Sequence, residues 1–121
     1  MKTAVLFSGQ GTQYVGMGKH LYENHTVCKR VFEEADSILG ESLSTLIFDG
    51  PAEALNLTRN TQPAVLTVGL AAWALMKHHG AKPKVVAGHS VGEFAALVAA
   101  GAMSFENALP LVRQRGEFMQ T

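Results

Sequence analysis

The 121-residue sequence predicts an α/β fold, with short parallel strands flanked by helices. Two continuous apolar runs, at 3–7 and 84–88, are typical of short strands buried in a parallel sheet. Each run ends in a turn that contains glycine, and segments with helical periodicity lie between and after them. Together these observations favour two parallel strands packed between helices.

Composition narrows the possible functions. The chain has 10 basic and 10 acidic residues, so nothing indicates a nucleic-acid or anionic-membrane partner. Its single cysteine, Cys28, excludes an internal disulfide framework and a multi-cysteine metal site, and favours a reduced, cytoplasmic setting. The apolar stretch at the start is too short for a signal peptide, and the apolar helices predicted near 63–76 and 91–103 are too short to span a membrane.

The turn after the first strand is rich in glycine, which raises the question of nucleotide binding. The dinucleotide fingerprint that would start at Gly9 has Tyr14 in place of its last glycine, and the one starting at Gly16 has Leu21 there. The phosphate-binding P-loop pattern is absent from the sequence. What remains is a loop, Gly9-Gln10-Gly11, whose backbone N–H groups can approach a ligand closely.

Two helices are predicted before the middle of the chain. The first covers about 27–39, with Thr26 as its cap, and its charged side is interpreted as solvated. Its apolar face consists of Val27, Val31, Ala35 and Ile38. Pro51 suits the first turn of a short second helix that ends near Leu57.

The next helix is predicted to be central and buried, because apolar residues occur on almost all of its sides. We expect it to begin at Pro63, with Asn60 or Thr61 as its cap, and to end near His79. Gly80 is suited to end it, since glycine readily adopts the left-handed conformation that follows many helices.

The second apolar run leads into Gly88-His89-Ser90-Val91-Gly92 and then into an alanine-rich helix. Gly-x-Ser-x-Gly between a strand and a helix predicts a nucleophile elbow, a strained turn that presents the serine hydroxyl at a helix N-terminus. The alternative is a capping box, in which the Ser90 hydroxyl accepts a hydrogen bond from the N–H of Glu93 and has no chemical role.

The last predicted helix starts at Ser104-Phe105 and is still continuing at the final residue, so we expect the protein to extend further. Its apolar face consists of Phe105, Ala108, Leu109, Leu111, Val112, Phe118 and Met119. Arg115 falls within this face and Arg113 opposite it. Because an unpaired buried charge is costly, Arg115 needs an anionic partner, either a protein carboxylate such as Glu93 or the carboxylate of a substrate.

Four stretches, in order, resemble one family: Phe7–Gln13, Asn60–Ala64, Gly88–Glu93 and Val112–Gly116. The chain resembles the malonyl-CoA:acyl carrier protein transacylases and the related acyltransferase domains of polyketide synthases. This resemblance implies that Ser90 is the nucleophile and that the backbone N–H groups of Gln10 and Val91 form the oxyanion hole. It also implies that Arg115 binds the malonyl carboxylate, that Gln62 lines the acyl pocket and that His89 shapes the site.

The resemblance implies transfer of a malonyl group from malonyl-CoA to the phosphopantetheine thiol of an acyl carrier protein, in fatty acid or polyketide biosynthesis. No cofactor is implied, since the CoA thioester is the substrate. Residues 1–121 would be the N-terminal part of one acyltransferase domain, namely part of its α/β-hydrolase-like subdomain without the ferredoxin-like subdomain. The missing C-terminal portion would then be a partner. It would carry the general-base histidine, because His20, His25, His78 and His79 belong to no family motif.

Other functions remain open from the sequence. A trans-acting polyketide acyltransferase would share every motif. An esterase-type serine hydrolase would share the elbow but would need no buried arginine. An inactive module that binds a carrier protein would account for the missing base. If part of the domain is missing, we also expect apolar surface to be exposed, which would make the chain prone to aggregation or dependent on a partner.

Overall fold

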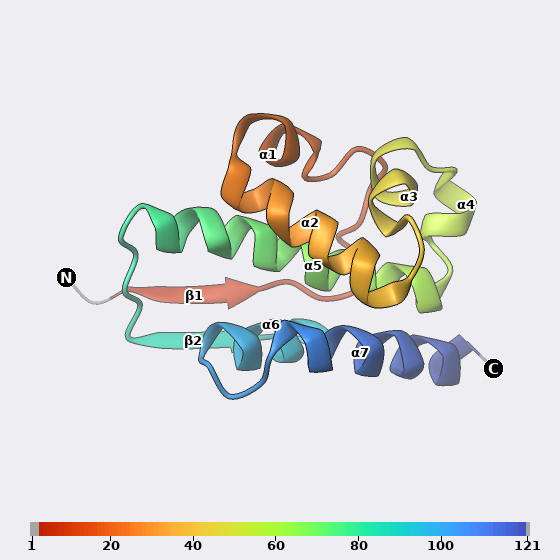
Figure 1. Ribbon diagram of the computed structural model, residues 1–121. Coiled ribbons are helices and arrows are strands. Elements are labelled where there is room, and N and C mark those ends of the chain that lie inside the picture. The colour runs from red at the N-terminus through yellow and green to blue at the C-terminus, as the bar shows by residue number, and fades with distance from the viewer. Residues whose placement is uncertain (1–2, 121) are drawn as a thin grey trace.

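A computed structural model describes residues 3–120 and shows helices arranged around two strands (Figure 1). The elements in chain order are β1 (Ala4–Phe7), α1 (Lys19–Asn24), α2 (Thr26–Leu39), α3 (Leu43–Asp49), α4 (Ala52–Leu55), α5 (Thr58–His78), β2 (Val85–Gly88), α6 (Gly92–Ala99) and α7 (Phe105–Gln120). In the view of Figure 1, α5 and α2 lie above β1, and α6 and α7 lie along and below the level of β2.

The strands pair in parallel, as the sequence predicts. The register runs from Ala4 opposite Val85 to Phe7 opposite Gly88. In a parallel pair the carboxyl ends of both strands lie at the same edge, so the turn after β1 and the turn after β2 leave the sheet together. This shared edge brings Gly9-Gln10-Gly11 next to the predicted elbow.

Helices cover only one face of this small sheet. Val5 and Phe7 are buried, and Phe7 packs against Gly69 of α5. On the opposite face Leu6 is 77% exposed and Val85 is 57% exposed. The expectation that helices flank the strands therefore holds for one face, and the expected exposure of apolar surface is confirmed on the other.

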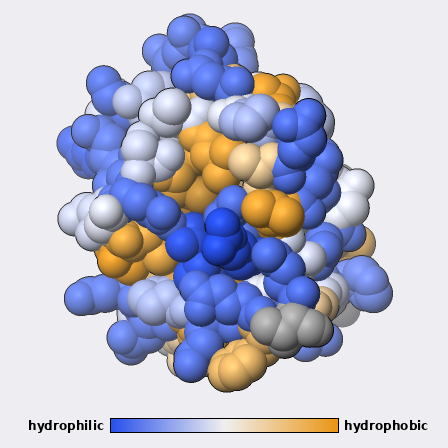
Figure 2. Space-filling model, turned by 90° about the vertical axis from the view of Figure 1, so that its right-hand side faces the viewer, coloured by the Kyte–Doolittle hydropathy of each residue, from blue (hydrophilic) through white to orange (hydrophobic). Residues whose placement is uncertain are grey.

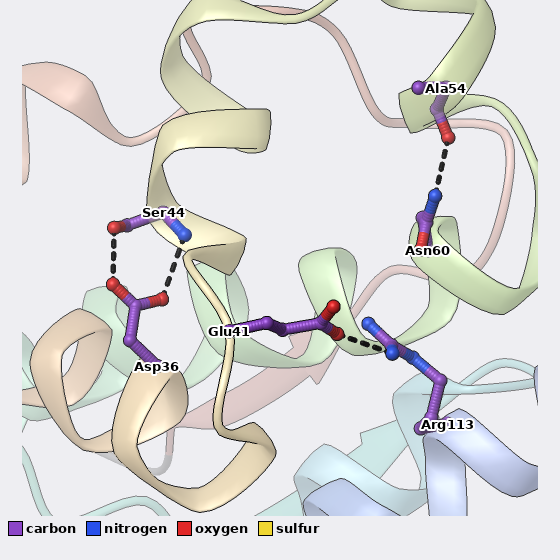
Figure 3. Close-up of polar contacts among 6 residues, drawn as sticks. All are labelled: Asp36, Glu41, Ser44, Ala54, Asn60 and Arg113. Atoms are coloured by element: carbon purple, nitrogen blue, oxygen red, sulfur yellow. Dashed lines mark hydrogen bonds and ion pairs between the residues drawn. The ribbon is translucent and has the colours of Figure 1, made fainter.

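Helix α5 is central and buried along its first half, as predicted, but its predicted start at Pro63 is wrong. The helix begins at Thr58, because the carbonyl of Leu57 accepts hydrogen bonds from the N–H groups of Asn60 and Thr61, both at 2.8 Å. Pro63 is tolerated inside the second turn, at the cost of one backbone hydrogen bond. Asn60 does not cap the helix, because its side chain donates to the carbonyl of Ala54 at 2.9 Å (Figure 3).

Polar side-chain contacts connect α2 and α7 to the segment around the start of α3. Thr26 is the first residue of α2 and caps nothing, so its predicted role is wrong. Asp36 of α2 accepts hydrogen bonds from the N–H (2.9 Å) and the hydroxyl (2.5 Å) of Ser44, which stabilises the start of α3 (Figure 3). The Asp36 carboxylate therefore connects α2 to α3, and it is not simply part of a solvated face as predicted. Arg113 of α7 forms an ion pair with Glu41, next to α3 (Figure 3).

The apolar core lies between α2, α5 and α7 and includes Cys28, Phe32, Ala64, Leu66, Leu109 and Val112. The prediction of one apolar face on α7 is partly wrong, because three of its members are exposed, namely Leu111, Phe118 and Met119. Figure 2, drawn from the side towards which β1 points, shows hydrophobic residues at the surface among hydrophilic ones. Within residues 3–120, no helix combines the length and the apolar character needed to cross a membrane.

Candidate active site

The turn after β2 has the strained geometry of an elbow. Ser90 has a φ of 57°, and it is the only non-glycine residue with positive φ within the described range 3–120. A Cβ on Gly88 would lie 1.9 Å from the carbonyl oxygen of Gly92, and one on Gly92 would lie 2.3 Å from the carbonyl oxygen of Phe7. Both glycines are therefore required, because strand, turn and helix backbones pack directly against one another.

The Ser90 hydroxyl does not cap α6, so the capping-box alternative is not supported. The N–H of Glu93 donates instead to the backbone carbonyl of Ser90, at 3.0 Å, and no side chain caps the helix. The hydroxyl is half-buried, and within the described part of the chain its one hydrogen-bond partner is Arg115. A hydroxyl without a capping role is available for chemistry.

The loop after β1 lies directly against the elbow. A Cβ on Gly9 would lie 2.5 Å from the carbonyl oxygen of His89 and 3.2 Å from the Cβ of Ser90. The side chain of Gln10 is held by Thr58, since its Nε2 donates to Oγ1 at 3.1 Å. The backbone N–H groups of Gln10 and Val91 donate to no other residue between 3 and 120. The two residues are direct neighbours of Gly9 and Ser90 in the chain, so their N–H groups stay the predicted donors of an oxyanion hole.

Arg115 of α7 lies beside Ser90, which is in the turn between β2 and α6. Its Nη1 donates to Oε1 of Gln62 at 2.5 Å, and its Nη2 lies 3.5 Å from Oγ of Ser90. The guanidinium carbon is 5.8 Å from the centre of the Phe94 ring, which places the cation against an aromatic side chain. Among the described residues no carboxylate pairs with Arg115, and Glu93 is exposed, so the alternative of a Glu93 partner is wrong.

A glycine brings α7 close enough for these contacts. A Cβ on Gly116 would lie 2.7 Å from Cα of Arg59 and 2.7 Å from the carbonyl oxygen of Thr58. Only a residue without a side chain allows α7 to approach the first turn of α5 this closely. Arg115 therefore reaches Gln62, which is fully buried on α5.

No histidine side chain among residues 3–120 forms a hydrogen bond with the Ser90 hydroxyl. His89 is exposed, and its side chain has no hydrogen bond within the described range, while its backbone carbonyl lies against Gly9. Its role in shaping the site stays a prediction. The His20 ring contacts Asn24 and His25, and the rings of His78 and His79 contact each other. No group of His, Cys, Asp and Glu in residues 3–120 is arranged to hold a metal ion.

Two residues of this site were not predicted from the sequence. Phe94 was given no role, and Met119 was placed in a buried apolar face. In the structure Nε2 of Gln62 donates to Sδ of Met119 at 2.9 Å. A signal for Met119 was present, since it follows Arg115 by four residues and therefore lies on the same side of α7.

Comparison with known proteins shows the family of this chain. The family model described as "Acyl transferase domain" matches residues 5–121. The malonyl CoA-acyl carrier protein transacylase of Bacillus subtilis strain 168 is 56% identical over 118 residues, which cover 98% of this chain and 37% of that protein. The crystal structure of the acyl-carrier-protein S-malonyltransferase of Burkholderia pseudomallei 1710b is 51% identical with a TM-score of 0.94, covering 100% of this chain and 39% of the other.

A further similar structure is of a malonyl-transacylase in complex with a type II polyketide synthase acyl-carrier protein. That transacylase is 43% identical to this chain with a TM-score of 0.94, and the match covers 99% of this chain and 39% of the other. The chain thus spans less than half the length of these relatives. Because the family model covers nearly all of the sequence, the chain belongs to the acyl transferase domain family, and its similar relatives are malonyl-CoA–acyl carrier protein transacylases.

Proposed function

We propose that the protein transfers a malonyl group from malonyl-CoA to the phosphopantetheine thiol of an acyl carrier protein, through an acyl-enzyme on Ser90. The observation that carries the proposal is the Arg115 guanidinium, 3.5 Å from the Ser90 hydroxyl and without a carboxylate partner among residues 3–120. An acyl group attached to Ser90 and ending in a carboxylate would supply the missing negative charge. Arginine suits this task because its planar head group can bind both carboxylate oxygens.

In the proposed reaction, Oγ of Ser90 attacks the thioester carbonyl carbon and the carbon–sulfur bond breaks. Coenzyme A leaves as a thiol after taking up the serine proton. The phosphopantetheine thiol then attacks the serine ester, and its proton returns to Ser90. The N–H groups of Gln10 and Val91 stabilise the oxyanion in both steps, each contributing about 3–4 kcal/mol by analogy with other oxyanion holes.

Arg115 and Gln62 would set the choice of acyl group. Gln62 neutralises no charge, since its amide oxygen is a neutral acceptor, so the guanidinium still requires an anion. A malonyl group satisfies it, whereas an acetyl group leaves a partly buried cation unpaired, at a cost of several kcal/mol. The reaction needs no cofactor, since the CoA thioester is the activated donor.

An acyl carrier protein is the proposed acceptor, in either fatty acid or polyketide synthesis and in the cytoplasm. Support comes from the similar malonyl-transacylase whose structure includes an acyl-carrier protein. A trans-acting polyketide acyltransferase is the same proposal with a different acceptor, and assays with carrier proteins from both pathways would separate the two.

The general base is proposed to lie in a part of the protein outside this sequence. No histidine side chain in the described part of the chain hydrogen-bonds the Ser90 hydroxyl. A serine without a base is a weak nucleophile at neutral pH. The activity is therefore proposed for the full-length protein that carries this chain.

The proposal is tested by Arg115→Ala in the full-length protein, with malonyl-CoA and acetyl-CoA as competing donors for transfer to a carrier protein. We expect the variant to lose its preference for malonyl-CoA, because only the malonyl group uses the guanidinium. Arg113→Ala is the matched control, since Arg113 lies two residues away and pairs with Glu41. It should keep the wild-type preference. Unchanged selectivity in the Arg115 variant would refute the role of this cation.

A second candidate is an inactive module that binds a carrier protein, and the lack of a histidine on the Ser90 hydroxyl favours it. Such a module would bind the carrier protein but acquire no malonyl group at Ser90. An esterase would release free malonate and leave the carrier protein unmodified. Analysis of the products therefore separates these functions from acyl transfer.

A further inference from the structure

We infer that Met119 is a positioning residue, which fixes the Gln62 amide and through it the Arg115 guanidinium. The inference deepens the proposed function and rests on it, because it concerns how the site selects a donor that carries a carboxylate. Three contacts carry it: Nη2 of Arg115 to Ser90, Nη1 of Arg115 to Gln62, and Nε2 of Gln62 to Met119.

Both the oxygen and the nitrogen of the Gln62 side-chain amide form hydrogen bonds. Its oxygen accepts from Arg115 at 2.5 Å, and its nitrogen donates to the Met119 sulfur at 2.9 Å. The residue has no exposed surface, so water does not replace either partner. Within the described part of the chain, the Met119 sulfur is the one acceptor for this nitrogen. A buried amide nitrogen without an acceptor is strongly disfavoured.

The orientation of this amide matters because its two ends are chemically opposite. A flipped amide would place its NH2 group against the guanidinium, and two donors do not bond each other. The sulfur of Met119 favours the orientation in which the oxygen faces Arg115, since it occupies the donor end. Loss of the sulfur leaves the buried amide nitrogen without its acceptor. The amide is then held only by Arg115, and the contact that positions Nη1 of Arg115 weakens.

Both partners of Gln62 come from α7. Arg115 and Met119 are four residues apart, so they lie on one side of the helix and hold the amide between them. Gly116 lies between them in the sequence and allows α7 to pack against α5. Met119 is 53% exposed, so its sulfur adds little to the apolar core, and its contact with Gln62 is the main interaction that its replacement would remove.

The test is Met119→Leu in the full-length protein, which keeps the size of the side chain and removes the acceptor. We expect the KM for malonyl-CoA to rise about three- to tenfold, the range for loss of one buried hydrogen bond. The kcat should hold, because the carboxylate is bound equally in the ground state and the transition state. The KM for acetyl-CoA, which makes no use of Arg115, should not change.

Two further variants separate positioning from a general structural effect. Met119→Gln supplies a carbonyl acceptor at the same place and should restore most of the wild-type KM for malonyl-CoA. Met76→Leu makes the same chemical change at another exposed methionine, four turns along α5 from Gln62, and should leave both KM values unchanged.

The outcomes are distinct. If Met119→Leu raises the KM for both donors equally, or if Met119→Gln fails to rescue it, the positioning role is wrong. If Met119→Leu leaves the KM for malonyl-CoA unchanged while the wild-type protein transfers malonyl groups, the inference also fails and the proposed function stands. If the wild-type protein does not take malonyl groups at all, the proposed function itself has failed.

Discussion

Gly116→Ala probes the contact that brings α7 to α5. The added Cβ would lie 2.7 Å from two backbone atoms, Cα of Arg59 and the carbonyl oxygen of Thr58. Ordinary contact begins at 3.4 Å, so one helix must move by about 0.7 Å. Backbone atoms do not rotate away as a flexible side chain would, so the whole first turn of α5 or the end of α7 has to shift.

The cost of this shift can be bounded. Overpacking of this kind destabilises proteins by about 1–3 kcal/mol. Alanine is about 1 kcal/mol more favourable than glycine inside a helix, which offsets part of that cost. We therefore expect a net loss of about 0–2 kcal/mol in the free energy of unfolding. The shift also lengthens the 2.5 Å contact between Arg115 and Gln62, so the KM for malonyl-CoA should rise.

Denaturant unfolding of the wild type and the variant measures the stability term, provided that the slope m is the same for both. Gly69→Ala is the matched control, because Gly69 also lies inside a helix but its Cβ would lie 3.4 Å from Cδ1 of Phe7, an ordinary contact. The control should be stabilised by up to about 1 kcal/mol. If Gly116→Ala proved as stable as Gly69→Ala with an unchanged KM, the close approach of α7 and α5 would be wrong.

Four other predictions concern the rest of the molecule. Asp36→Ala should lower the free energy of unfolding by about 1–2 kcal/mol, measured by denaturant titration, because Ser44 loses both hydrogen bonds at the start of α3. Burial raises the pKa of the Cys28 thiol, so native protein should resist alkylation at pH 8 until it unfolds; fast labelling of the folded protein would contradict this. Because the pKa of this thiol is higher in the folded protein than in the unfolded chain, the thiol stabilises the fold at low pH. This stabilisation declines as the pH rises above the ordinary pKa of a thiol. The free energy of unfolding of Cys28→Ala should therefore fall less at alkaline pH than that of the wild type. Glu41→Gln should cost no more than about 1 kcal/mol and less in high salt, since Glu41 of the ion pair with Arg113 is about half exposed.

Most of the fold could be predicted from the sequence, because strands and buried helices leave strong periodic patterns. The strand predictions at 3–7 and 84–88 differ from the observed bounds by one residue at the start of each strand. The start of α5 could not be placed, because proline at 63 is typical of a first helical turn, whereas Leu57 accepts the bonds that start the helix earlier. That difference depends on the contact of Asn60 with α4, which no local pattern reveals.

The candidate site was predictable where it depends on local geometry. The Gly-x-Ser-x-Gly turn predicted the strained Ser90, and helical periodicity placed Arg115 on the inner side of α7. The partner of Arg115 was not predictable, because it depends on how α7 meets α5 across Gly116. For the same reason the exposure of Met119 was missed, since periodicity shows which side a residue lies on but not whether another element covers that side.

The proposed transfer requires that Ser90 carries the malonyl group. The most direct measurement is mass spectrometry of the full-length protein after incubation with malonyl-CoA, followed by mapping of the modified peptide. We expect one malonyl group on Ser90, none in the Ser90→Ala variant, and loss of the label when a phosphopantetheine-bearing carrier protein is added. A protein that transfers malonyl groups while Ser90 stays unmodified, or whose label maps to another residue, would contradict it.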